Sequence, residues 1–176
     1  MRRHRAVKGA IAIALITVAL VGGSAANAAK PERAPYITDP LPLSPGQACA
    51  FDVEIAQVPG SKYTQTSFSD GRFVVTGSGH DRVRSLPNGP SLTLRTSGKL
   101  TLTELTNGDQ RVQASGRTVF YFFEGDQGPF GEVGADGALY YIVGHVDEVL
   151  DPDTDFTVTS FEWSGTATEL CSQITP

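Results

Sequence analysis

The residues best spaced for chemistry are the acids that follow residue 150. Asp151, Asp153 and Asp155 alternate along the chain, and Glu162 stands at the twelfth position counted from the first of them. Carboxylate ligands have this spacing in an EF-hand calcium loop. Phe156 occupies the position where an EF-hand needs glycine, and no helical pattern flanks the segment, so an EF-hand is excluded. We expect an acidic hairpin loop, with a weak calcium site formed by Asp151, Asp153 and Asp155 as the alternative, and no other cofactor.

Two histidines lie close to acids. His80 precedes Asp81, and His145 lies two residues before Asp147. A histidine beside a carboxylate can act as a general base or a metal ligand. Strand alternation turns His80 outward, whereas both faces around His145 carry apolar residues and leave its direction open.

The sequence shows no recognisable catalytic motif. A nucleophile elbow, an H-E-x-x-H motif and a P-loop are all missing. Glu124, Asp126 and Glu132 lie in or beside a glycine-rich loop at 125–137, and a glycosidase needs two facing carboxyl groups. Nothing in the sequence makes any two of these acids face each other. We therefore assign no catalytic residue and favour a non-catalytic protein.

Aromatic side chains supply the other candidate site. The interior of a small barrel is either filled by side chains or hollow enough for one small ligand, and the sequence leaves both open. The segment 119–123 is apolar on both faces, so it needs a cover: the N-terminal arm, a protein partner or an apolar ligand. The candidate cavity residues are Phe51, Phe73, Phe120, Phe122, Tyr140, Trp163 and His145.

The N-terminus has the pattern of a secretory signal peptide. Residues 1–8 are basic, and the apolar run at 10–22 is shorter than the roughly 20 residues that span a bilayer. Ala26 and Ala28 are the small residues of a cleavage site, which we place after Ala28. A secreted protein without a membrane anchor is expected. The predicted divisions are a signal peptide at 1–28, an extended Pro-rich arm at 29–47 and an all-β domain at 48–176.

The charge distribution excludes two classes of partner. The full chain carries −5, but four of its fourteen basic residues lie in the first eight positions. The remainder has ten basic and nineteen acidic residues, a net charge of −9. Because such a body repels nucleic acid and anionic membranes, neither is expected as a partner.

The two cysteines are expected to form a disulfide. Cys49 and Cys171 both follow the signal peptide, and an exported protein with two cysteines most simply pairs them. A metal-binding or reactive thiol pair would need a neighbouring histidine or a second nearby cysteine, which the sequence lacks.

The pattern of the body predicts an all-β fold. Apolar and polar residues alternate with period two, and no long helical periodicity occurs. Glycines recur near the middle of successive long strands, which indicates bends where a sheet curls. We predict an antiparallel meandering barrel of seven or eight strands, closed where the disulfide joins the first strand to the end of the last, with a β-sandwich as the alternative.

Several short motifs resemble those of small secreted actinobacterial proteins of unknown function. These motifs are Cys49-Ala50-Phe51-Asp52-Val53, Asp70-Gly71-Arg72, Gly125-Asp126-Gln127-Gly128 and Leu170-Cys171. The resemblance implies export, one disulfide and an all-β body, and it carries no activity. A barrel of this kind is also similar in architecture to lipocalins and to allene oxide cyclase or dirigent proteins, without a diagnostic motif of either.

Two functions follow as hypotheses. The first is a secreted, non-catalytic barrel that binds a small apolar ligand or a protein partner on its surface. The alternative is a cavity-based enzyme of the isomerase or cyclase kind, which requires His145 or a buried glutamate to point into the interior.

Overall fold

The computed structural model describes residues 31–154 and 156–176. The predicted signal peptide at 1–28, the first two residues of the predicted arm and Asp155 lie outside the described residues. Within the described part, no helix is long and apolar enough to cross a membrane.

The all-β prediction is confirmed, because the described residues form strands and two short 3₁₀ turns without an α-helix. The elements are β1 (Glu32–Pro35), β2 (Leu41–Leu43), β3 (Val53–Gln57), β4 (Lys62–Ser67), β5 (Phe73–Ser85), β6 (Ser91–Glu104), β7 (Gln110–Phe122), β8 (Gln127–Gly128), β9 (Gly131–Glu132), β10 (Ala138–Asp151), η1 (Pro152–Thr154), β11 (Thr157–Glu169) and η2 (Cys171–Gln173). Two of these strands, β1 and β2, lie in the segment predicted as an extended Pro-rich arm, and β8 and β9 lie in the glycine-rich loop.

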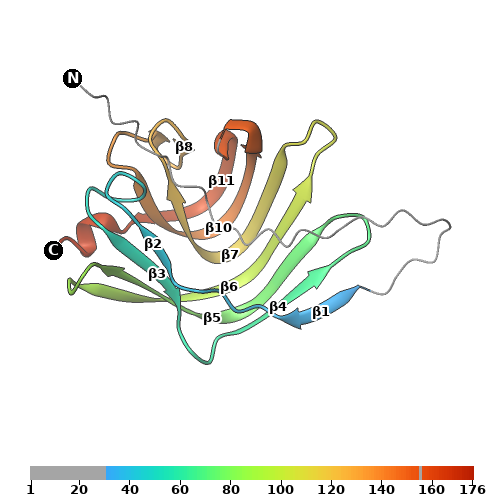
Figure 1. The fold of residues 1–176 in the computed structure, drawn as a ribbon, viewed down its shortest axis with the longest axis horizontal. Helices are drawn as coiled ribbons and strands as arrows, with labels where there is room; N and C mark the ends of the chain where they lie inside the picture. Colours follow the sequence, from blue (N-terminus) through green and yellow to red (C-terminus); the bar gives the residue numbers. More distant parts are fainter. Residues whose placement is uncertain (1–30, 155) are drawn as a thin grey trace, which may run out of the picture.

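Nine strands form one antiparallel sheet (Figure 1). Seven of them follow the order β1-β4-β5-β6-β7-β10-β11; β3 also pairs with β5, and β2 pairs with β3. The long strand β5 pairs with β4 along its first half and with β3 along its second half. The meander from β4 to β11 follows the prediction, but the strand number exceeds the predicted seven or eight because the arm contributes two strands.

Hydrogen bonds do not close this sheet in the described part of the chain: β11 pairs only with β10, and β1 pairs only with β4. The disulfide between Cys49 and Cys171 is present, with 5.6 Å between the two Cα atoms. It joins the loop before β3 to the turn η2 after β11. The two cysteines lie just outside the strands, so the disulfide links the two ends of the domain without strand pairing between β3 and β11 in the described residues.

Five glycines lie opposite one another in a row across five adjacent strands: Gly77, Gly98, Gly116, Gly144 and Gly165. We call them the glycine row. All five have positive φ values between 113° and 153°, a conformation that side chains rarely tolerate. This confirms that the recurring glycines stand at one level of the sheet.

The long strands of the sheet are strongly curved (Figure 1), and each carries its positive-φ glycine of the row near its middle. Phe122 pairs with Ala138 at one end of β10, and Phe161 pairs with Glu148 near the other. Ala138 and Glu148 are ten residues apart along β10, a separation of about 33 Å in a straight strand. The Phe122 and Phe161 rings are nevertheless centred 5.1 Å apart. The two halves of the bent strands therefore pack against each other.

The larger hydrophobic core fills the inside of this bend. Even-numbered residues of β10 face it, because side chains alternate along a strand. Its buried residues are Val112, Ala114, Phe120, Phe122, Val133, Ala138, Ile142, Val146, Leu150 and Val158.

A smaller core covers the opposite face of β7 and β10 near the disulfide. It explains the segment 119–123, since Val119 and Tyr121 pack against this core while Phe120 and Phe122 enter the larger one. The cover comes from the chain itself, including Leu43 of the predicted arm. The buried residues of the smaller core are Leu43, Ala48, Cys49, Val53, Val83, Leu139, Leu170 and Ile174.

Candidate functional site

The aromatic residues predicted to line one cavity are spread over several places. Phe120 and Phe122 are buried in the larger core, and Tyr140 and Trp163 pack against it. Phe51 packs against the smaller core on the other face of the sheet. These rings therefore fill two separate cores.

Phe73 and His145 lie elsewhere again. Phe73 makes an edge-on contact with Tyr36, with ring centroids 6.2 Å apart. His145 is exposed on the outer face of the sheet, opposite Ser115 of β7 and Ser164 of β11. His80 is also exposed.

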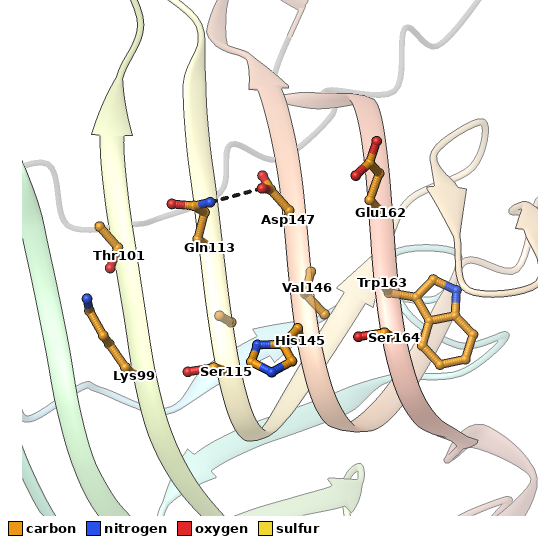
Figure 2. A pocket seen from close by; sticks show the side chains of 11 residues that line it. Lys99, Thr101, Gln113, Ser115, His145, Val146, Asp147, Glu162, Trp163 and Ser164 are labelled. Carbon is orange, nitrogen blue, oxygen red and sulfur yellow. Dashed lines mark hydrogen bonds between the residues drawn. The ribbon is translucent and has the colours of Figure 1, made fainter.

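Figure 2 shows the outer-face pocket, a shallow hollow of about 460 Å³ across β6, β7, β10 and β11. Polar side chains from four strands point to the same side, with His145 near the middle of the view. The lining residues are Lys99, Thr101, Gln113, Ala114, Ser115, His145, Val146, Asp147, Glu162, Trp163 and Ser164.

The Asp147 carboxylate of this pocket is already occupied. It accepts hydrogen bonds from Arg111 Nε at 2.8 Å and Nη2 at 2.5 Å, and from Gln113 Nε2 at 2.9 Å. The bond from Arg111 holds the pKa of Asp147 below its usual value. A carboxylate that is ionised and paired in this way is a poor proton acceptor, so it does not activate His145 as a base.

The acids predicted as a weak calcium site lie at the turn between β10 and β11. Asp151 Oδ1 accepts the backbone N–H of Asp153 at 2.9 Å, which caps the turn η1. Asp155, the third member, lies outside the described residues. Among the residues that are described, no group of three or more His, Cys, Asp or Glu side chains could hold a metal ion.

A second pocket, which we call the crease pocket, opens where β6 separates from β7. The pairing of these strands ends at Ser97 and Arg117, one residue beyond the glycine row. The first six residues of β6 then pair with β5 alone, and a space of about 220 Å³ remains beside them. Its lining residues are Tyr36, Thr38, Gln57, Tyr63, Val75, Asp81, Thr96, Ser97, Gly98, Lys99, Leu100, Arg117 and Thr118.

Polar groups converge in the crease pocket from five strands and the segment after β1. The Tyr63 hydroxyl hydrogen bonds to the hydroxyl of Thr96, a residue that is only 3% exposed. Burial raises the pKa of the Asp81 carboxyl, and the Thr96 hydroxyl beside it opposes this shift. Burial also raises the pKa values of Tyr36 and Tyr63, and the negative charge of Asp81 adds to both shifts. The pocket thus offers two phenols, the buried Thr96 hydroxyl and a carboxyl whose pKa is raised by burial.

Glu148 is a buried carboxyl on the other side of the molecule. Its side chain faces the larger core between Val112 and Phe161, and it is 8% exposed. Burial, together with the charges of Asp126 and Asp147, raises the pKa of Glu148 to about 7. This group is poised to gain or lose a proton near neutral pH.

Asp126 helps to cover the larger core. Its Oδ2 accepts the N–H of Phe123 at 2.8 Å, and its Oδ1 accepts the N–H of Val158 on β11 at 3.1 Å. These hydrogen bonds attach the loop that carries β8 and β9 to the start of strand β11.

Sequence reasoning named Asp81 only as the neighbour of His80 and did not single out Tyr63 or Thr96, because the split between β6 and β7 is a tertiary feature. Glu148 could have been found, since it alternates with Val146 and Leu150 on an otherwise apolar strand face. An acid at an inward position of a strand is a recognisable signal for a perturbed group.

Comparison with known proteins gives no match to a protein family, a curated protein or a solved structure. Functional inference therefore rests on the geometry of the chain itself.

Proposed function

We propose that this chain is a secreted, non-catalytic β-sheet protein that binds a small, mainly apolar ligand in the crease pocket. The observation that carries this proposal is the convergence of the Tyr63 and Thr96 hydroxyls and the Asp81 carboxyl on a space walled by Val75 and Leu100. A binding site of this kind combines apolar walls with a few placed polar groups.

The size and polarity of the pocket define the ligand class. A volume of about 220 Å³ is below the roughly 300 Å³ at which drug-sized sites begin, so the ligand is a small ring or a short chain. The phenols and the Asp81 carboxyl, whose pKa burial raises, suit a ligand with one or two hydrogen-bonding groups. Lys99 and Arg117 among the lining residues add positive charge to the pocket.

Secretion is supported by the N-terminal pattern of the sequence and by the disulfide between Cys49 and Cys171. Disulfides persist in oxidising compartments and are rare in the cytosol. The strand alternation and the recurring glycines that favoured a barrel also suit a ligand-binding protein. We therefore keep the predicted barrel architecture as part of the proposal.

The proposal is tested by NMR titration of the exported chain with phenol, p-cresol, indole and hexanol. At least one probe should shift the backbone amide signals of Thr96, Ser97 and Thr118 more than those of the outer face. The Tyr63→Phe and Asp81→Asn variants should weaken that probe's affinity several-fold. Asp136→Asn, at an exposed loop position, is the matched control and should bind as the parent does. If no probe at millimolar concentration moves these amides, the crease pocket is not a ligand site.

Glu148 favours a second candidate, a cavity-based isomerase or cyclase. Such an enzyme needs one buried acid or base with a pKa near the working pH, and Glu148 meets this requirement whereas the exposed His145 does not. A test is the exchange of α-protons of cyclohexanone with deuterated solvent. Exchange that depends on the parent protein and disappears in Glu148→Gln would support the enzyme, and equal exchange in both proteins would eliminate it.

A further inference from the structure

The outer edge of β11 has the features of a pairing surface. β11 is thirteen residues long, and among the described strands it pairs only with β10. An edge strand of this length presents unpaired backbone groups to any strand that approaches. Natural edges are commonly protected by proline or lysine, and β11 contains neither.

The hydrogen bonds between β10 and β11 show which residues of β11 face the open edge. The N–H of Leu170 donates to the Leu139 carbonyl of β10. In an antiparallel ladder, hydrogen-bonded pairs alternate with pairs that make no bonds to each other. The register between β10 and β11 then turns the backbone groups of Trp163, Gly165 and Ala167 away from β10 and toward the open edge.

Both ends of this edge are capped, and its middle is open. At the start of β11, the N–H of Val158 is bound by Asp126 Oδ1 at 3.1 Å. At the end, Gln173 Nε2 donates to the Glu169 carbonyl at 2.6 Å. Within residues 31–154 and 156–176, no hydrogen-bond partner is found for the outward backbone groups between these caps. Gly165 and the residues on either side of it are exposed.

The glycine row restricts what can pair there. At the level of the row, Gly116 of β7 lies opposite Gly144 of β10, and both residues have a positive φ. A strand that continues the sheet past Gly165 must bend at the same level, and glycine is the residue that permits this bend. β11 itself has the required glycine at its centre.

We propose that two copies of this chain pair edge to edge through β11, antiparallel and with Gly165 opposite Gly165 of the second copy. In this register Trp163 lies opposite Ala167, and Glu162 lies opposite Thr168, so no like charges face each other. The arrangement is a closed two-fold dimer, because the same edge serves both copies. The opposite edge of the sheet suits pairing poorly, since β1 has four residues and ends at Pro35, which has no N–H.

Sedimentation equilibrium of the exported chain tests the assembly. We expect the mass to rise from one chain toward two over the micromolar range. In the double variant Ser164→Lys, Thr166→Lys, the new positive charges of one copy lie opposite those of the second copy. Their repulsion should raise the dimer dissociation constant by roughly tenfold or more. Ser69→Lys with Thr106→Lys adds the same charge at exposed turn positions and should leave the constant unchanged. Loss of association in both double variants would show a general charge effect and overturn the pairing.

Cysteine cross-linking tests the register. Ser164 and Thr166 lie directly opposite each other across the two-fold axis, at a Cβ separation of about 5 Å, whereas identical positions lie diagonally at about 7–8 Å. A mixture of Ser164→Cys and Thr166→Cys chains should therefore form a covalent dimer under mild oxidation faster than either chain alone. Equal rates in all three samples, or a single-chain mass at every concentration up to millimolar, would refute the proposal.

Discussion

Gly98 of β6 and Gly116 of β7 face each other so closely that a Cβ atom added to Gly98 would lie 1.8 Å from the Ser115 carbonyl oxygen. A Cβ added to Gly116 would lie 2.1 Å from the Ser97 carbonyl oxygen. Because both obstacles are backbone atoms of the neighbouring strand, neither can move aside without breaking the sheet. The bend that creates the two cores and the crease pocket thus depends on missing side chains.

Gly116→Ala should destabilise the fold severely, by about 3 kcal/mol or more, because it adds a backbone clash to the strain of a positive φ. Gly131→Ala is the matched control. Its φ of 109° is close to the 113° of Gly116, but nothing lies within 4 Å of its added Cβ. The control should cost only about 1–2 kcal/mol. Urea unfolding of the two variants measures the difference, and similar losses of stability would show that the close approach in the glycine row is unimportant.

Replacement of Glu148 by glutamine should remove a pH dependence of stability. The raised pKa of about 7 means that the folded protein keeps a proton on Glu148 that the unfolded chain loses above pH 4.5. Stability should therefore fall as pH rises from about 4.5 to 7, by about 3 kcal/mol in total, and stay constant above that range. Urea unfolding at pH 4, 6 and 8 should show this decline in the parent and not in Glu148→Gln.

Glu132→Gln is the control for this experiment, because Glu132 is exposed in the nearby β8–β9 hairpin. It should follow the parent at every pH. A Glu148→Gln variant that declines as steeply as the parent would mean that another group carries the pH dependence.

Removal of the disulfide should lower the stability of the protein. The bond closes a loop with a sequence separation of 122 residues, for which chain entropy predicts a loss of roughly 5 kcal/mol on removal. A double Cys49→Ala, Cys171→Ala variant should therefore unfold at lower urea concentration than the parent. Reductant should move the parent to the same midpoint and leave the double variant unaffected; a parent that is insensitive to complete reduction would contradict this prediction.

Processing of the N-terminus is predicted from the sequence alone. Chain exported from a bacterial host should begin at Ala29, because the small residues Ala26 and Ala28 mark the cleavage site. Intact-mass spectrometry of the secreted protein gives the cleaved end directly. Substitution of Ala28 by a bulky residue such as tyrosine should slow or shift cleavage, and unchanged processing of that variant would place the site elsewhere.

Local pattern was sufficient to predict much of the fold. Alternation marked the long strands, and the recurring glycines marked the level of the bend. The arm was harder to predict, because β1 and β2 contain prolines and β1 pairs with β4 rather than with the strand that follows it.

What the sequence by itself determined was the strand class, the level of the glycine row and the pairing of Cys49 with Cys171, since each depends on residue type or on local spacing. Only the tertiary structure decided that β11 does not pair with the first strands, that β6 separates from β7, and that Glu148 and Asp81 become partly or fully buried. These features depend on which distant segments pack together, and the free energy of that packing is a property of the whole chain. The candidate site lies in this second group, because the crease pocket exists only where two adjacent strands cease to pair.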